Sequence, residues 1–464
     1  MSGEHGMSWA EEELKSTDLG DRRREHRLLT IVEDLIAQPN ASVLQASRDD
    51  AALQGLYKFW SNRRITPAAI LSGHIDQTVE RCLAHQTVLT IQDTTELDFS
   101  THRHTRGLGP ISDASATGLK VHLTLCSSDA GVPLGILQET VWTREKTRRG
   151  AGYRDRQAAI EEKESYRWLE HQAASQQLIP ESVEVITITD REGDIYDLFA
   201  QPRRPRAEFL IRAAQNRNTK RDAYAEEVQP LFGAIRQQPW QGQKTIELQR
   251  TPKRTPRLAT LSVRYATLWL QPPQNHARAD DFKVISVQVF LAEDEHPPTG
   301  EKAISWLLLT TLPVNDFEDA CRCLERYSFR WLIERYNFTL KSGCRLEALQ
   351  LESADRLERA LATYSIVAWR LLWLTYEARV HPEDSVETVL SEPEWQALHC
   401  TIHQTTELPP DPSSIGQCVR WIAKLGGFLG RKGDGEPGVK TLWRGLQRLH
   451  DIAATWQLLR ASGE

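Results

Sequence analysis

The fold of this chain is constrained most by residues 87–213, where the spacing of the hydrophobic residues switches between the repeat of a strand and the repeat of a helix. Residues 87–100 have the Val, Thr, Ile and Leu content of a strand, and residues 118–142 alternate as two strands joined by a Ser-Asp-Ala-Gly turn. A helix, a buried strand that runs into a second helix, and a last strand follow, at 161–177, 183–201 and 207–213. This order predicts an α/β fold with a mixed sheet.

Segments with a different spacing of apolar residues flank and interrupt this core. Apolar residues recur at steps of three and four through residues 8–80, which predicts a small helical domain. Short alternating segments between Pro- and Gly-bearing turns predict an inserted β region at about residues 215–305. We therefore expect three domains: helices in 1–75, the α/β core with its insertion in 76–375, and a helical region in 376–464.

The composition indicates a globular protein of a reducing compartment. The chain has 464 residues and no uninterrupted run of 18 apolar residues, so we expect no transmembrane helix. Its first residues lack the apolar core of a signal peptide. The seven cysteines are scattered and odd in number, which argues against a disulfide framework or a zinc site. We expect a cytoplasmic location.

Charge is unevenly distributed along the chain. The net charge is −6, but residues 201–260 hold 13 Lys and Arg against 5 Asp and Glu, and residues 144–156 hold 6 against 2. Residues 382–412 hold seven acids, no Lys or Arg, and five prolines. Basic patches on a mildly acidic protein suit a specific polyanion contact, and solvated loops are an equally weighted alternative for each patch alone.

Three carboxylates occupy positions on the predicted strands and helices that are informative about function. Asp93 lies on the first strand, Asp190 ends a buried strand, and Glu334 lies on a late helix. Each has a simpler explanation: a turn former, a helix cap and an exposed ion-pair partner, respectively. Taken together, the three positions match the arrangement that gathers two hard divalent cations on a ribonuclease H-like sheet.

The stretch from Tyr327 to Cys344 predicts one amphipathic helix. At about 100° per residue, Tyr327, Arg330, Glu334 and Lys341 fall within an arc of about 60°, opposite an apolar face. A solvated face with ordinary ion pairing is the simpler interpretation of this stretch alone.

These four residues also carry a resemblance to a known family. Their spacing reproduces the Tyr-x2-Arg-x3-Glu-x6-Lys signature of bacterial insertion-sequence DDE transposases of the cut-and-paste (Tn-five-type) branch. Six further segments resemble the family's two aspartate contexts, its tryptophan-bearing strand, its DNA-binding domain and its dimerisation segment. They are IQDTTELDFS (91–100), TDREGDIYDLF (189–199), SWLLLTT (305–311), LGDRRREHRL (19–28) with ALQGLYKFWSN (52–62), and residues 421–449.

The resemblance runs from about residue 9 to about residue 456, with one departure. Relatives often carry His or Lys between the signature's Glu and Lys, where this chain has Arg335, Asn337 and Phe338. One auxiliary DNA contact is therefore in doubt, but the metal site is not.

The resemblance implies a ribonuclease H-like catalytic core with two Mg²⁺ ions, or Mn²⁺ as a substitute, held by Asp93, Asp190 and Glu334. Two such ions about 3.5–4 Å apart activate the attacking oxygen and stabilise the leaving oxygen of an in-line displacement. The resemblance also implies DNA contacts by Tyr327, Arg330, Lys341 and Trp306, the last in the space left by a flipped base, although a tryptophan on a buried strand is often core. Arg22, Arg23 and Arg27 are candidates for contacts with the terminal repeats.

The expected function follows from these implied roles. A homodimer binds double-stranded transposon ends and target DNA in the bacterial cytoplasm, associated with the nucleoid and without a membrane partner. Hydrolysis frees a 3′-hydroxyl, which attacks the opposite strand to form a hairpin; a second water opens the hairpin, and the end then attacks target DNA. Two alternatives remain: a catalytically silent DNA-binding regulator derived from a transposase, and a ribonuclease H-like metal nuclease or resolvase.

Overall fold

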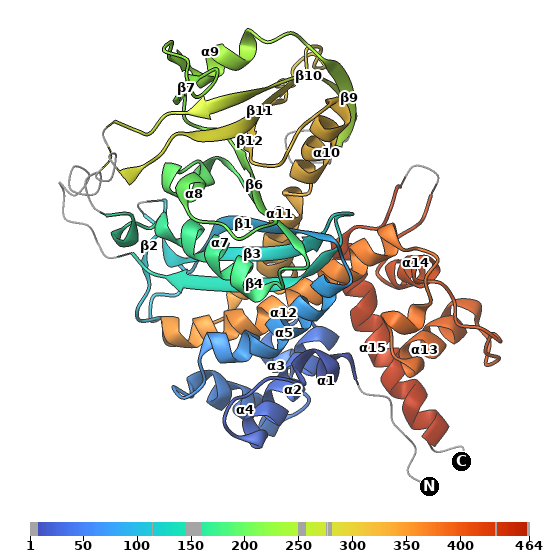
Figure 1. The fold of residues 1–464 in the computed structure, drawn as a ribbon. Coiled ribbons are helices and arrows are strands. Elements are labelled where there is room, and N and C mark those ends of the chain that lie inside the picture. Colours follow the sequence, from blue (N-terminus) through green and yellow to red (C-terminus); the bar gives the residue numbers. More distant parts are fainter. Residues whose placement is uncertain are drawn as a thin grey trace. The chain divides into compact units, whose positions relative to one another are not determined.

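In the computed structural model, the chain forms two compact units (Figure 1). Unit 1 comprises Met1–Cys82, Thr94–Lys146 and Leu332–Glu464, and unit 2 comprises Leu83–Asp93 and Thr147–Trp331. The structure describes residues 8–113, 115–144, 159–248, 257–274, 276, 281–431 and 434–461. Apart from Arg144, the basic run at 144–156 lies outside the described residues.

Unit 2 is built around the sheet that the sequence predicts. Its elements are the first part of β1 (Thr87–Asp98), α7 (Tyr166–Leu178), β5 (Glu184–Thr189), α8 (Tyr196–Ala200), β6 (Ala207–Arg212), β7 (Asn218–Lys220), β8 (Gln229–Pro230), α9 (Leu231–Arg236), β9 (Gly242–Leu248), β10 (Arg257–Leu270), β11 (Ile285–Glu293), β12 (Ser305–Thr310) and α10 (Phe317–Ser328).

The sheet of unit 2 is mixed, as expected. β1, β5 and β6 are parallel neighbours, with Thr87 opposite Glu184 and Val185 opposite Ala207. β12 then pairs antiparallel with β6, and β11, β10 and β7 follow, all antiparallel. The inserted β region therefore extends the core sheet, because β12 returns to the edge of β6 after the insertion.

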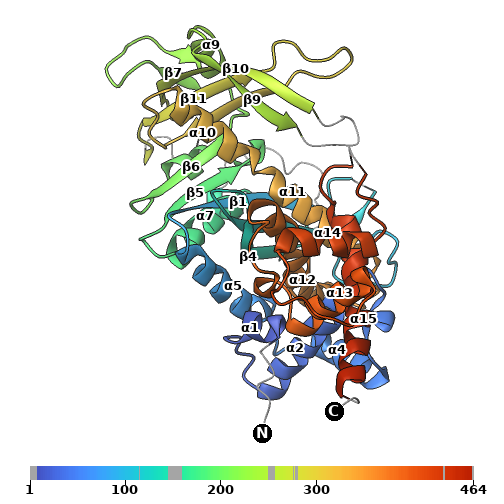
Figure 2. The same ribbon diagram turned by 90° about the vertical axis from the view of Figure 1, so that its right-hand side faces the viewer.

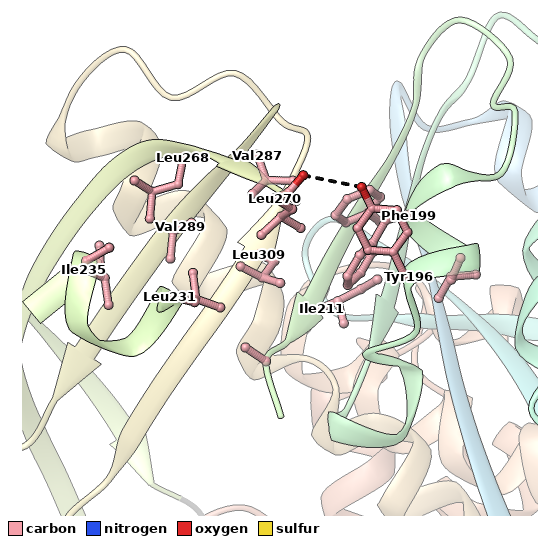
Figure 3. Packing of buried hydrophobic residues seen from close by; sticks show 14 of the residues in the cluster. Tyr196, Phe199, Ile211, Leu231, Ile235, Leu268, Leu270, Val287, Val289 and Leu309 are labelled. Atoms are coloured by element: carbon pink, nitrogen blue, oxygen red, sulfur yellow. Dashed lines mark hydrogen bonds between the residues drawn. The ribbon is translucent and has the colours of Figure 1, made fainter. Parts of the chain in front are cut away.

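The core of unit 2 joins the insertion to the parallel strands. Leu231 and Ile235 of α9, Leu270 of β10 and Phe199 of α8 belong to one buried cluster (Figure 3). The Tyr196 hydroxyl donates to the backbone oxygens of Leu270 (3.4 Å) and Lys283 (2.8 Å). This continuous core makes the insertion a rigid part of the unit.

Unit 1 is mainly helical. Its elements are α1 (Trp9–Leu14), α2 (Arg22–Ala37), α3 (Val43–Ala46), α4 (Asp50–Ser61), α5 (Pro67–Leu83), β2 (Gly109–Pro110), β3 (Thr117–Ser128), β4 (Pro133–Trp142), α11 (Trp331–Phe338), a π-helical turn η5 (Thr339–Gly343), α12 (Ala354–Val380), α13 (Glu392–His403), α14 (Ile415–Leu425) and α15 (Val439–Ala461). The predicted hairpin at 118–142 is the antiparallel pair of β3 and β4.

Helix α12 is the centre of unit 1 (Figure 2). Its apolar residues are buried nearly all round, as the sequence predicts. Trp60 of α4 donates through Nε1 to Thr363 Oγ1 (3.2 Å), and Trp369 donates to the Pro133 carbonyl of β4 (3.0 Å). The helices of the N-terminal and C-terminal regions therefore share one packing partner.

A buried polar network fixes α1 in unit 1. Glu13 accepts hydrogen bonds from both terminal nitrogens of Arg81 (2.9 Å each), and its Oε1 lies 2.5 Å from His74 Nδ1. His74 Nε2 accepts from the Ile136 amide (2.9 Å), so the proton of the neutral ring is on Nδ1. Burial alone raises the pKa of Glu13, but His74 and Arg81 lower it to about 2.

One helix prediction is wrong in detail. The stretch from Tyr327 to Cys344 is not one continuous helix: α10 ends at Ser328, and the Arg330 amide bonds to the Tyr327 carbonyl (3.0 Å), a tightened i to i+3 turn. α11 then gives way to a π turn, closed by the Cys344 amide on the Thr339 carbonyl (2.9 Å). Because the helical pitch changes at both places, a constant rotation of about 100° per residue cannot place the four signature residues on one helix face.

The acidic, proline-rich stretch at 382–412 lies within the expected helical region and contains α13. This helix begins with a capping box: the Ser391 amide and hydroxyl both donate to Glu394. The pattern Ser-x-x-Glu is a sequence signal for such a helix start. Pro393 is compatible with the helix because it lies in the first turn, where no backbone donor is needed.

None of the helices among the described residues offers a stretch long and apolar enough to span a lipid bilayer.

Candidate active site

The first two predicted acids occupy matching positions on neighbouring strands of unit 2. β1 and β5 pair in parallel with an offset of 97 residues, from Thr87 with Glu184 to Ile91 with Ile188. Asp93 and Asp190 each lie two residues beyond the last pair. Since neighbouring strands are about 4.8 Å apart and side chains alternate with a period of two, this register predicts that both carboxylates leave the same face at about the same level.

Local structure holds Asp190 in place. Its backbone is still extended (φ −82°, ψ −159°), and its side chain caps the 3-10 turn Arg191–Gly193 by accepting from the Glu192 amide (2.8 Å). A Cβ at Gly193 would lie 2.3 Å from Thr189 Oγ1, so only glycine lets the turn close on the strand. The capping role that the sequence suggests as the simpler explanation is present, and it leaves Asp190 Oδ2 outside the cap.

Tyr327 ends α10 beside Trp306 of β12. Its side chain is 3 % exposed, and its ring meets the Trp306 ring edge-on, with centroids 5.3 Å apart and planes at 71°. Among the described residues, no partner reaches the Tyr327 hydroxyl at full hydrogen-bonding geometry, and the nearby Arg212 guanidinium makes at most a weak contact with it. Trp306 is only half-buried, so it is not an ordinary core tryptophan.

The electrostatic surroundings of Tyr327 combine one carboxylate with several arginines. Burial raises the pKa of Tyr327, the Asp190 carboxylate adds to this effect, and Arg330 and Arg212 oppose it. The phenol is therefore a neutral donor at physiological pH. Burial lowers the pKa of Arg212, and the charges of Arg191 and Arg330 lower it further.

Arg191 and Arg212 are site residues that the sequence reasoning missed. Together with Arg330 they concentrate three positive charges around Tyr327 and Asp190. Arg212 ends β6, and its guanidinium donates to the Ser305 carbonyl (3.0 Å) next to Trp306. A signal was available: Arg212 is the only cation in the strand segment AEFLIRA, and Arg191 directly follows Asp190. Such clustering of guanidinium groups is the usual arrangement for binding phosphate oxygens.

Glu334 and Lys341 belong to unit 1. Glu334 is half-buried in the first turn of α11. Lys341 lies in the π turn, and its ammonium donates to the Glu96 carbonyl (2.5 Å). Unit 2 thus contains Asp93, Asp190, Tyr327, Arg330 and Trp306, whereas Glu334 and Lys341 are described within unit 1.

The described residues hold one preformed group of three potential metal ligands. Glu377, His381 and Asp384 place their ligand atoms within 4.8 Å of one another at the C-terminal end of α12. His381 Nδ1 already lies 2.8 Å from Glu377 Oε1, and Asp384 is exposed, so an ordinary i,i+4 ion pair accounts for this group.

The three N-terminal arginines have different environments on α2. Arg22 is exposed. Arg23 pairs with the helix cap Asp21 through two nitrogens (3.2 and 3.0 Å). Arg27 lies against Gly55 of α4, where a Cβ would come within 2.6 Å of its guanidinium.

Three protein-family models match this chain. The model described as Transposase DNA-binding matches residues 6–65, Transposase DDE domain matches residues 170–370, and Transposase Tn5 dimerisation domain matches residues 366–461. The fold and these matches define a DNA-binding protein with a DDE catalytic domain of ribonuclease H-like architecture. The chain belongs to the Tn5-type DDE transposases. It therefore carries a domain for DNA binding and one for dimerisation, and its DDE domain implies dependence on a divalent metal ion.

Proposed function

We propose that this chain cuts transposon ends and joins them to target DNA, with Asp93, Asp190 and Glu334 as its metal ligands. The register of β1 and β5 supports the proposal most directly, because Asp93 and Asp190 each lie two residues beyond its last pair. Carboxylate oxygens are the ligands that Mg²⁺ takes from proteins, so this pair fits such an ion. Glu334 as the third ligand rests on the four-residue signature.

Mg²⁺ or Mn²⁺, two per site, supplies activation of the attacking oxygen and neutralisation of charge on the phosphate. The chain's own groups position the DNA. Arg330 grips a phosphate with two parallel donors, Lys341 contributes a point charge, and the unpartnered Tyr327 hydroxyl donates to a phosphate oxygen. Arg212 and Arg191 add positive charge around the same atoms.

The reaction consists of four displacements at phosphorus. Water first breaks one phosphodiester bond and leaves a 3′-hydroxyl on the transposon end. This hydroxyl attacks the opposite strand, forming a hairpin and releasing the flanking DNA. A second water opens the hairpin, and the regenerated 3′-hydroxyl attacks target DNA. Trp306, half-buried against Tyr327, fills the space of a base displaced by the hairpin bend.

The test is incubation with the ends of the chain's own element, with and without Mg²⁺. Wild-type protein should give nicked, hairpin and joined products in that order, and Glu334→Gln should give none while still binding the ends. Glu318→Gln, an exposed carboxylate on α10 that is paired with Arg322 and lies outside the proposed ligand set, serves as the matched control. Nicks without hairpins or joined products would favour a simple nuclease, and binding without any cleavage would favour a silent regulator.

A further inference from the structure

A second cationic site lies within unit 1, next to the π turn. A cavity of about 480 Å³ is lined by Lys341, Ser342, Arg345, Glu347, Thr101 and His102. Lys341 and Ser342 come from the π turn, whereas Thr101 and His102 follow β1 in the chain. The cavity thus brings two cations, a histidine and two hydroxyls together from distant parts of the sequence.

Arg345 has an unusual backbone for its side chain. It adopts the left-handed conformation (φ 49°, ψ 37°) directly after the π turn ends at Gly343 and Cys344. Left-handed residues commonly terminate helices, but Gly or Asn normally takes this position because a Cβ is unfavourable there. A long cationic side chain at a strained position indicates that the side chain itself has a role. Arg345 is also exposed to solvent.

His102 has an unused hydrogen-bonding atom. Its ring packs against Phe99, with centroids 5.3 Å apart, and its backbone bonds with Phe99 and Thr105 fix the loop. Among the described residues, its buried Nδ1 has no hydrogen-bond partner. Because Nδ1 is shielded from solvent in the free protein, a bound oxygen acceptor satisfies an Nδ1–H group here only after the His102 ring shifts towards the cavity.

The charges at the cavity favour an anion. Lys341 and Arg345 supply two positive charges, and Glu347 is the one carboxylate among the described lining residues. Glu347 Oε1 already accepts from the Asp98 amide (3.0 Å), which fixes this carboxylate on the loop before Ser100. Hydroxyls of Ser342 and Thr101 add donors of the kind that bind phosphate oxygens.

We propose that this cavity binds a backbone phosphate of the transposon-end DNA, with Arg345 and His102 as additional binding residues beside Lys341. The inference rests on the proposed function, because it takes end DNA as the ligand, and it adds two residues outside the four-residue signature. The contact is to the sugar-phosphate backbone, so it positions the DNA without reading its sequence.

Two substitutions of Arg345 separate binding from folding. Arg345→Gln keeps the strained backbone and removes the charge, whereas Arg345→Asn removes the charge and suits the left-handed conformation. Both variants should bind a duplex carrying the element's own end about tenfold more weakly at moderate salt, and the slope of log K against log salt should fall by about one. Thermal stability should rise or stay level in Arg345→Asn, so a folding defect cannot explain its weaker binding.

Affinity is measured in EDTA, across about 50 to 200 mM salt, for the full chain. Arg420→Gln is the matched control, an exposed α14 arginine paired with Glu436, and its slope should equal that of the wild type. His102→Ala should weaken binding in the same direction. The inference is overturned if both Arg345 variants bind with wild-type affinity and slope. If the wild type cleaves its ends normally in that case, the proposed function stands and only this site fails.

Discussion

Asp93 on β1 and Asp190, which directly follows β5, each lie two residues beyond the last register pair of these two adjacent parallel strands. Their separation of 97 residues has no meaning as a sequence motif, yet it equals the register offset of β1 and β5. We therefore expect the sheet to bring this distant pair of acids close together. Both follow the last parallel pair of β1 and β5, and the edge beyond such pairs is where α/β sheets commonly build their sites.

The first prediction separates the two roles of Asp190. Asp190→Asn keeps an oxygen that can cap the Glu192 amide but loses the negative charge, whereas Asp190→Ala loses both. Both should abolish nicking, hairpin formation and strand transfer together while end binding persists. Only Asp190→Ala should also lose stability, by about 1 kcal/mol.

Asp93→Asn is the companion variant and should give the same loss of all steps with no loss of stability. Products are resolved on denaturing gels, and Mn²⁺ binding is followed by calorimetry. Wild-type nicking by either asparagine variant would remove that residue from the metal site.

The second prediction concerns Trp306. Extruding a base costs a few kcal/mol, and an aromatic ring in the vacated stack offsets part of this cost only when the hairpin forms. Trp306→Ala should therefore slow hairpin formation about tenfold more than the first nick. Trp240→Ala, which removes an exposed ring stacked on Arg264, is the control and should not change the ratio of the two rates.

A time course on one end with both species resolved measures this ratio. Equal slowing of the two steps by Trp306→Ala, or insoluble protein, would show that Trp306 serves packing through its edge-on contact with Tyr327.

The third prediction concerns the three arginines of α2. Arg22 is exposed, Arg23 is engaged by Asp21, and Arg27 lies on Gly55. Arg22→Ala should weaken end binding and lower the salt slope by about one, because each neutralised phosphate releases a counterion. Arg27→Ala should instead act mainly on the packing of α2 against α4.

Lys15→Ala, in which the lost cation is paired with Glu12 on α1, is the control. Point variants are required here, because deletion of residues 1–70 would remove Trp60 from its buried place on α12. An unchanged slope in Arg22→Ala would move recognition to another surface.

The sequence allowed the fold to be predicted where local patterns decide the structure. Alternating and helical periods identified β1, β3, β4, β5 and α12, because burial imposes those periods directly. It could not show the tightened turn at Phe329 and Arg330 or the π turn at Lys341, since both depend on tertiary packing of the ends of α10 and α11. Domain boundaries at 75 and 375 stay a prediction.

The same distinction applies to the site residues: local patterns reveal some of them, and tertiary structure alone identifies the others. Asp93 and Asp190 could be predicted because Asp93 lies on a recognisable strand and Asp190 directly follows another. Arg212 could not be assigned, because its proximity to Tyr327 arises from β12 returning to pair with β6 across the insertion. Arg345 carries no sequence signal at all, since only its backbone conformation distinguishes it from other surface arginines.

The fourth prediction concerns acid stability through Glu13 and His74. The pKa of Glu13 is lowered from 4.5 to about 2 in the folded state, so its contribution is full above pH 4.5 and is lost as pH falls towards 2. Burial lowers the pKa of His74 from 6.5, so the unfolded chain takes up this proton first and stability also falls below pH 6.5. Both groups therefore destabilise unit 1 on acidification.

Glu13→Gln should lower the free energy of unfolding by about 3 kcal/mol at pH 7, because it leaves Arg81 without its carboxylate. The difference from wild type should shrink between pH 4.5 and 2, as measured by urea denaturation at each pH. Glu12→Gln, on the exposed side of α1, is the control and should change stability little. A constant difference across this range would exclude the proposed linkage.

The last prediction uses the unpartnered hydroxyl of Tyr327. In the free protein this buried group has no hydrogen bond at full geometry among the described residues and at most a weak contact with Arg212, so its removal in Tyr327→Phe should leave folding nearly unchanged. In the DNA complex the same hydroxyl donates to a phosphate oxygen, and its loss should slow hairpin formation by about tenfold or more, because a hydrogen bond to a charged group contributes about 1.5–3 kcal/mol. The rate should therefore fall without a matching loss of stability.

Tyr336→Phe on α11 is the control: its hydroxyl already donates to the Ser365 carbonyl (3.4 Å), so its loss should lower stability without a specific effect on the hairpin step. Thermal melts and a single-turnover time course measure the two quantities, and a stability loss in Tyr327→Phe would show that the hydroxyl has an internal partner, such as Arg212, in place of DNA.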